Sequence, residues 1–231
     1  MIFSNISKNI FNQIITFGTR SISDIFIVIF ISRYSSVENL GLYSFAISFS
    51  LIARLILDMG IGMYLVREIS KYKSMVEKYV SNTMSLFLML SPIIFILTAI
   101  IIFSTVDDIL KISAVFLTLS GFILVSFTSV FHSVFLAFSK LKFQSYSILL
   151  QECIFLISSF IVLFNKFDFI YIFHLYFFSR LISFLISLIF FKINFGKLKL
   201  GFDFIFINKI IKECSPFFLN FIMTAVYARG V

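Results

Sequence analysis

The chain of 231 residues is 60% apolar, 19% aromatic and only 13% charged, whereas a soluble domain is about 25% charged. Its 19 basic and 11 acidic residues are too few to cover the surface of a soluble protein of this length. The net charge of +8 does not indicate nucleic-acid binding, because the 35 phenylalanines lie in long apolar runs rather than on an exposed basic face. The composition therefore excludes a water-soluble monomer and predicts a membrane protein with no nucleic-acid partner.

Apolar segments of about 20 residues, the length of a transmembrane helix, recur along the chain. Six complete segments cover residues 10–32, 41–66, 82–104, 112–138, 146–165 and 168–191. A seventh begins near Ser215 and continues to the last residue. The segments lack the period-two alternation of a membrane β-barrel. The sequence thus predicts an all-α polytopic bundle of six full spans and the start of a seventh.

The basic residues between the spans are distributed unevenly. If the N-terminus is cytoplasmic, the inner segments contain Lys8, Arg67, Lys71, Lys73, Lys78, Lys140, Lys142, Lys192, Lys197, Lys199, Lys209 and Lys212. The outer segments then contain only Arg33, Lys111 and Lys166. Because cytoplasmic loops are enriched in Lys and Arg, this bias predicts a cytoplasmic N-terminus.

Two inner segments have the pattern of helices that lie along the inner leaflet. Residues 67–80 place apolar side chains on one helical face, and residues 203–213 begin with Asp203 as a candidate N-cap. The predicted organisation is a six-helix lobe over 1–202, an interfacial linker helix over 203–214, and the start of a second lobe over 215–231.

Ionisable residues inside the spans are the candidate functional residues, because each is costly in hydrocarbon. They are Arg20, Arg54, Arg180, Arg229, Asp24, Asp58 and Glu152. Spans one and two both contain Arg-x3-Asp, which places the two charges of each helix on one face. The spans are antiparallel, so each arginine is level with the aspartate of the other. We expect a four-member charge network near the bilayer centre, which either only joins the two helices or lines a transport cavity.

Arg180 lies near the middle of span six. Its nearest candidate partner, Glu152, differs in depth by about 9 Å, so the sequence does not favour a pair. An unpaired arginine at this depth suits an anionic ligand such as a phosphate. His132 and His174 are expected near the outer ends of their spans and are too isolated for a metal site. No metal and no cofactor is expected, and the chain has no nucleotide-binding motif.

Three segments suggest a family. They are VENLGLYSFA at 37–46, DMGIGMYLVREIS at 58–70, and SPFFLNFIMTAVYARGV at 215–231, with Pro216, Tyr227 and Arg229. Together they resemble the polysaccharide transporter and oligosaccharide flippase branch of the multidrug/oligosaccharidyl-lipid/polysaccharide exporter superfamily. The resemblance covers essentially the whole chain in the order of its spans and loops.

The resemblance implies a transporter, not an enzyme. It would flip undecaprenyl-pyrophosphate-linked oligosaccharides, such as O-antigen units of lipopolysaccharide, across the cell inner membrane by alternating access between two lobes. The implied substrate contacts are Arg20, Arg54 and Arg180, with Asp24, Asp58 and Glu152 as balancing or proton-coupled partners. Membrane lipids and other polysaccharide-assembly membrane proteins are the further implied partners. Family members usually have twelve or more spans, so we expect this chain to be an N-terminal half that needs a second copy or polypeptide.

Three alternatives remain open. A drug or cation antiporter of the same superfamily would use Asp24 for proton exchange, although the intramembrane arginines disfavour cationic cargo. A membrane enzyme of polysaccharide assembly would need paired acids, but the adjacent Asp107 and Asp108 would point about 100° apart on a helix and lie in a short loop. The third alternative is a truncated, non-functional fragment.

Overall fold

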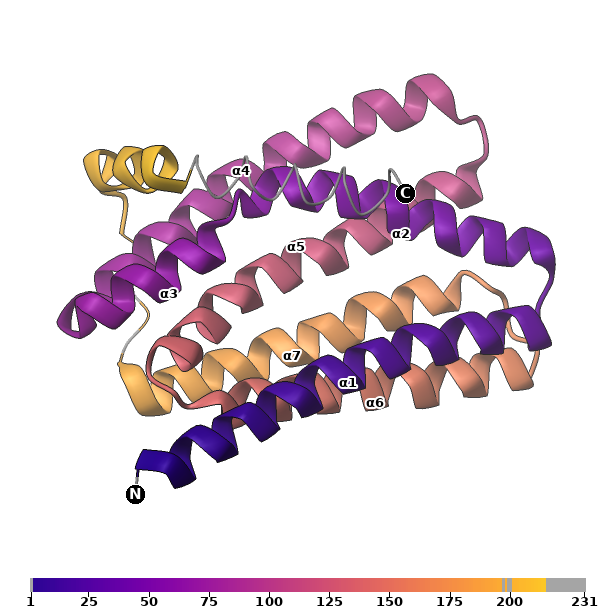
Figure 1. Cartoon of the computed structure of the whole chain (residues 1–231). Helices are drawn as coiled ribbons and strands as arrows, with labels where there is room; N and C mark the ends of the chain where they lie inside the picture. The colour runs from indigo at the N-terminus through magenta and orange to yellow at the C-terminus, as the bar shows by residue number, and fades with distance from the viewer. Residues whose placement is uncertain (1, 197, 199–200, 215–231) are drawn as a thin grey trace, which may run out of the picture.

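The structure, a computed structural model, describes residues 2–196, 198 and 201–214 (Figure 1). Every regular element in this part of the chain is a helix, which confirms the predicted all-α bundle. The elements are α1 Ile2–Tyr34, α2 Val37–Asp58, α3 Ile61–Lys71, the 3-10 turn η1 Lys73–Met75, α4 Val76–Thr105, α5 Ile109–Ala137, α6 Leu141–Phe164 and α7 Tyr171–Phe195, followed by a helix over 204–214. Six helical segments of the described chain are long and apolar enough to cross a membrane. The predicted seventh span lies outside the described residues.

Helix α5 is the centre of the bundle (Figure 1). Helices α1, α6 and α7 pack together on one side of it, and α2, α3 and α4 lie on the other. Although α1 and α2 are joined by a short turn, α1 packs mainly on α6 and α2 mainly on α5. The α1–α2, α4–α5 and α6–α7 connections lie at one end of the bundle, which we call the α1–α2 end; the opposite end carries the α5–α6 turn and is called the α5–α6 end.

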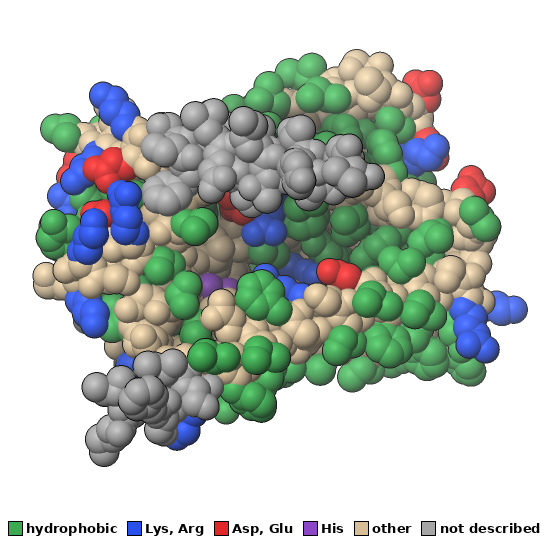
Figure 2. All heavy atoms as spheres, in the orientation of Figure 1, with side chains coloured by type: hydrophobic (Ala, Val, Ile, Leu, Met, Phe, Trp, Pro, Cys, Tyr) green, Lys and Arg blue, Asp and Glu red, His purple; other side chains and the backbone are tan. Residues whose placement is uncertain are grey.

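Large apolar side chains cover much of the outer surface (Figure 2). Ile100, Phe103 and Ile193 are 63%, 64% and 74% exposed. Extended apolar surface of this kind is unfavourable in water and is the normal surface of a lipid-facing helix. The chain is therefore a multi-pass membrane protein, and the buried polar groups between its helices are the feature that needs explanation.

The predicted second span, residues 41–66, is not one helix. The chain breaks between α2 and α3 at Met59 and Gly60, which both have left-handed backbone angles with φ of 42° and 73°. Glycine adopts this conformation without a steric penalty, so Gly60 marks the break. α3 then packs across α5 toward the α5–α6 end, and its buried face includes Tyr64 and Leu65.

The prediction of a single interfacial helix over 67–80 is also wrong, because the segment belongs to two helices. The first part of the segment completes α3, which ends where Tyr72 leaves the helical region with φ of −123° and ψ of 65°. After η1, Val76 begins α4. The apolar face inferred from the sequence therefore combined residues of two helices: Ile69 is buried on α3, and Tyr79 on α4.

The helix over 204–214 begins with the predicted N-cap. Asp203 Oδ1 accepts a hydrogen bond of 3.1 Å from the backbone N–H of Phe206, and Asp203 Oδ2 lies 3.0 Å from Lys78 Nζ. The backbone N–H of Asp203 donates to Asn82 Oδ1 at 2.9 Å. These contacts attach the start of the helix to α4.

The rest of this helix docks through an apolar face and one ion pair. Ile207, Ile210 and Cys214 are buried in the same core cluster as residues of α3 and α4. Near its end, Glu213 Oε2 lies 3.1 Å from Arg67 Nη2 on α3. The linker helix is thus held to this lobe at both ends.

Acidification is expected to release the start of this helix only at strongly acidic pH. The hydrogen bond from the N–H of Phe206, and then Lys78, lower the pKa of Asp203 from its ordinary value. A carboxyl with a lowered folded pKa stabilises docking above its unfolded pKa, and the contribution is lost as pH falls through the folded pKa. Amide hydrogen exchange at Phe206, corrected for its intrinsic pH dependence, should show constant protection down to about pH 4 and loss below it. The Asp203→Asn variant should lack this transition, and a wild-type transition near neutral pH would contradict the assignment.

Candidate functional site

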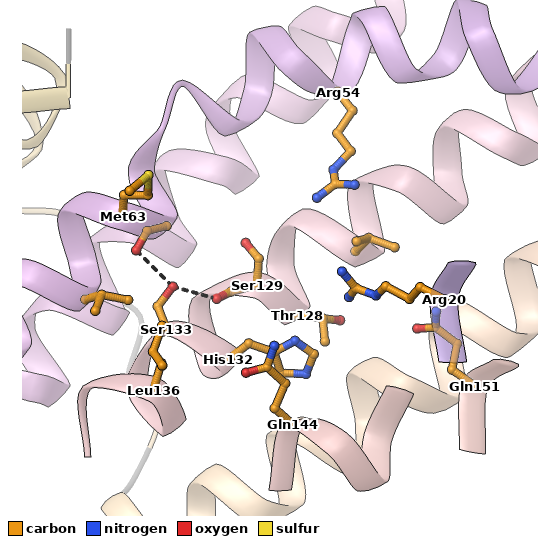
Figure 3. Close-up of a pocket in the computed structure, with 13 residues that line it drawn as sticks. Arg20, Arg54, Met63, Thr128, Ser129, His132, Ser133, Leu136, Gln144 and Gln151 are labelled. Carbon is orange, nitrogen blue, oxygen red and sulfur yellow. Dashed lines mark hydrogen bonds between the residues drawn. The ribbon is translucent and has the colours of Figure 1, made fainter. Parts of the chain in front are cut away.

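Two adjoining cavities lie beside α5, between the two groups of helices (Figures 2 and 3). The smaller, of about 270 Å³, extends toward α3, and the larger, of about 440 Å³, contains Asp24 and Tyr43 in its wall. Arg20 and Arg54 line both. The two cavities therefore meet at this pair of arginines, and Figure 2 shows basic, acidic and histidine side chains in the hollow.

The two arginines face each other from different helices. Arg54, on α2, forms the predicted i,i+4 pair with Asp58, with 2.9 Å between Nε and Oδ2. Arg20, on α1, extends toward the same space from the opposite wall (Figure 3). Two guanidinium groups repel each other, so an anion placed between them relieves that repulsion and accepts their hydrogen bonds.

The predicted four-member network does not form. Among the described residues Arg20 makes no salt bridge, either with Asp24 on its own helix or with Asp58 on α2. The reason lies in the packing: α1 rests on α6 and α2 rests on α5, so the charged faces of the two spans line a cavity instead of meeting. Arg20 also reaches the smaller cavity, which Asp24 does not line. Only the Arg54–Asp58 pair of the predicted network is present.

Glu152 and Arg180 form the pair that the sequence did not favour. Glu152 Oε1 lies 3.4 Å from Arg180 Nη2. The same carboxylate accepts hydrogen bonds of 2.7 Å from Ser23 Oγ and 2.7 Å from Gln151 Nε2. Both charged residues are buried, with 4% and 6% exposed. This cluster joins α1, α6 and α7.

The expected depth difference of about 9 Å does not hold when both residues are counted from the turn that joins their helices. From the connection between Phe164 and Tyr171, Glu152 is 12 residues back along α6 and Arg180 is 9 residues along α7. That difference of three residues is about 4.5 Å along the axis, which a long arginine side chain spans. Arg180 is therefore paired with Glu152, and it also lines the larger cavity.

Aromatic side chains surround the Arg180 guanidinium. Its carbon lies 4.1 Å from the ring centroid of Tyr176 and 5.0 Å from that of Phe155. Nη1 donates to Ser179 Oγ at 2.9 Å, while Nε has no hydrogen-bond partner in the described part of the chain. Of the three arginines proposed to contact substrate, Arg180 is packed and paired, Arg54 is paired at the cavity edge, and Arg20 has the least compensated charge. Arg229, the fourth intramembrane arginine, lies outside the described residues.

Neutral polar residues on α5 and α6 complete the smaller cavity, and the sequence analysis missed most of them. They are Thr128, Ser129, His132, Ser133, Gln144 and Gln151 (Figure 3). Except for His132, these side chains are not ionisable, so the criterion of charged residues inside the spans does not find them. The signal in the sequence is the polar cluster SFTSVFHS at 126–133, which is unusually rich in hydroxyl groups for the interior of a span.

His132 and His174 were both expected near the outer ends of their spans, but they lie toward opposite ends of the bundle, so this cannot hold for both. His132 lies late in α5, toward the α5–α6 end, because α5 starts at the α4–α5 connection and runs in that direction. Its Nε2 is 2.9 Å from Ser147 Oγ and 3.3 Å from Ser187 Oγ. His174 lies at the start of α7, outside both cavities, with Nδ1 3.1 Å from the Ile170 carbonyl. No group of three His, Cys, Asp or Glu in the described chain is arranged to hold a metal ion.

A family model described as "Polysaccharide biosynthesis protein" matches residues 2–229. The chain belongs to the polysaccharide biosynthesis protein family. Searches of curated proteins and of solved structures gave no match. Family membership confirms the resemblance, and the six membrane-crossing helices make this member of the polysaccharide biosynthesis family a multi-pass membrane protein.

A close helix contact supports the charged cluster in this polysaccharide biosynthesis protein. A Cβ atom on Gly121 of α5 would lie 2.8 Å from two ring carbons of Tyr176, the residue that packs on Arg180. We expect Gly121→Ala to displace that ring and to destabilise the protein by about 1–3 kcal/mol. Thermal unfolding in detergent measures the effect. Gly41→Ala is the matched control, because Gly41 has no atom within 4 Å of its added Cβ; equal melting temperatures for the two variants would contradict the prediction.

Proposed function

We propose that the chain is a transporter component that moves lipid-linked oligosaccharides across the cytoplasmic membrane, and that it is not an enzyme. The observation that carries the proposal is the Arg20–Arg54 pair facing one cavity inside a membrane bundle. Arginine is well suited to bind phosphate oxygens, which its planar group contacts in pairs. A pyrophosphate that links a lipid to a sugar, such as undecaprenyl pyrophosphate, supplies such oxygens.

The arrangement of apolar and polar surface supports the same substrate. The cavities offer a polar environment between helices for a sugar-phosphate head group, while the outer helix surfaces suit a polyprenyl chain in the bilayer. Alternating access between two lobes would move the head group. In this scheme Asp24, Asp58 and Glu152 balance the cavity charge or couple transport to protons.

The proposed orientation places the N-terminus in the cytoplasm and the protein in the inner membrane. Basic residues of the described chain cluster at the α5–α6 end, among them Lys73 and Lys140. Such clusters favour the cytoplasmic face and its anionic lipids. Membrane lipids and other polysaccharide-assembly membrane proteins are the proposed partners.

One observation favours a second candidate, a proton- or cation-coupled drug antiporter. Asp24 lines the larger cavity, is exposed, and makes no salt bridge with any described residue. However, Arg20, Arg54 and Arg180 outnumber the acids of that cavity, Asp24 and Glu152. This surplus of positive charge favours anionic cargo over cationic cargo.

Translocation in proteoliposomes tests the proposal. The purified chain is reconstituted with a fluorescent polyprenyl-pyrophosphate-linked sugar, and a reductant added outside measures how much label has moved between leaflets. We expect faster movement than in protein-free liposomes, with no increase for a fluorescent phosphatidylcholine. Movement of a cationic dye but not of the sugar lipid would favour the antiporter. Because alternating access needs two lobes, cross-linking first verifies that the liposomes contain paired copies of the chain. No movement of either compound by paired copies would contradict both candidates.

A further inference from the structure

The smaller cavity differs in chemistry from the arginine pair at its edge. Apart from Arg20 and Arg54, the described residues that line it are uncharged. Its polar wall comes from α5 and α6, with apolar side chains such as Met63 and Val66 of α3 opposite. A ligand that fits here is therefore anionic at one end and uncharged but polar over the rest.

Several groups in this wall have unused hydrogen-bonding capacity. The side-chain amide of Gln144 has no hydrogen-bond partner within the described part of the chain. His132 uses Nε2 for Ser147 and Ser187, while its Nδ1 has no partner among the same residues. Gln151 donates from Nε2 to Glu152, so its Oε1 remains as an acceptor. Gln144 is only half-buried, and all three residues line the cavity, so these groups can donate to or accept from a polar ligand that enters it.

The hydroxyl groups on α5 complement these amides. Thr128, Ser129 and Ser133 donate their protons to backbone carbonyls on their own helix at 2.7, 2.7 and 2.9 Å. Ser133 also contacts the carbonyl of Gly62 on α3 at 3.1 Å (Figure 3). With their protons committed, their oxygens can still accept hydrogen bonds. The wall therefore presents mainly acceptors, with the Gln144 amide as a donor, to a ligand rich in O–H groups.

We propose that the smaller cavity is a sugar subsite, in which the monosaccharide next to the phosphate binds against His132, Gln144 and Gln151 while the phosphate lies between Arg20 and Arg54. The inference rests on the proposed function. It adds that the arginine pair contacts the phosphate and that the polar wall of α5 and α6 contacts the sugar. Sugar hydroxyls both donate and accept, as this wall requires. These three residues then contribute to selection of the first sugar.

Binding of paired probes to the purified full chain in nanodiscs tests the subsite. The probes are farnesyl pyrophosphate and its esters with N-acetylglucosamine and with galactose, and the dissociation constants are measured by isothermal titration. We expect at least one ester to bind about tenfold more tightly than farnesyl pyrophosphate. Each of Gln144→Leu and His132→Phe should reduce this preference about fivefold, the typical effect of one hydrogen bond, and leave farnesyl pyrophosphate binding unchanged.

Matched controls separate the subsite from general effects. Gln13→Leu and His174→Phe make the same changes outside both cavities and should retain the full preference. If the Gln144 and His132 variants retain it too, or if neither sugar improves binding to the wild type, the subsite is overturned while the anion site stands. If Arg20→Gln leaves the affinity for all three probes unchanged, the anion site of the proposed function fails, and the subsite fails with it.

Discussion

Replacing Arg20 by glutamine is expected to reduce translocation of the sugar lipid about tenfold to a hundredfold without lowering the amount of protein in the membrane. A charge-assisted hydrogen bond to phosphate in a partly buried site contributes about 1.5–3 kcal/mol, which gives a factor of this size. Arg20 makes no hydrogen bond or salt bridge with another described residue. The fold therefore does not depend on its charge, and the loss should fall on transport.

Two further variants sharpen this test. Arg54→Gln leaves the Asp58 carboxylate without its partner at 2.9 Å, so it should lower both transport and membrane abundance. Arg33→Gln, an exposed change near the end of α1 and outside both cavities, should change neither. Translocation rates in proteoliposomes and quantitative blotting of membranes separate the two effects. Normal transport by the Arg20 variant would remove the arginine pair as the substrate contact.

Replacing Glu152 by leucine is expected to destabilise the protein more than any other single change considered, by about 3–5 kcal/mol. The change leaves the buried Arg180 guanidinium without a counter-charge and removes the acceptor of Ser23. A buried charge that has lost its partner carries its full desolvation penalty. Thermal unfolding in detergent should show a much lower melting temperature.

A double-mutant cycle distinguishes the pair from ordinary packing. Because Glu152→Leu with Arg180→Leu removes both charges, the double variant should be more stable than Glu152→Leu alone. Glu38→Leu, on an exposed carboxylate of α2, is the matched control and should leave the melting temperature nearly unchanged. Strictly additive losses in the cycle would show that the two side chains do not act as a pair.

The lengths of the apolar segments were sufficient to predict the helical membrane bundle. Six of the predicted segments correspond to membrane-crossing helical segments, because about 20 apolar residues can satisfy their backbone inside a bilayer only as a helix. The sequence also identified Asp203 as an N-cap and Arg54–Asp58 as an i,i+4 pair, since both depend only on neighbours along one helix. The break at Gly60 was not located, because hydropathy continues across it.

Contacts between helices were decided by tertiary packing. The seven charged residues inside the spans could be listed from the sequence, but their partners depend on which faces meet and on where each helix ends. Arg20 and Asp24 share a helical face and still do not pair, whereas Glu152 and Arg180 pair because α6 packs on α7. A charged side chain inside the membrane must be paired with an opposite charge or face a cavity, because burial in hydrocarbon is costly. The packing of α1 on α6 and of α2 on α5 determines which of the two applies to each charged residue.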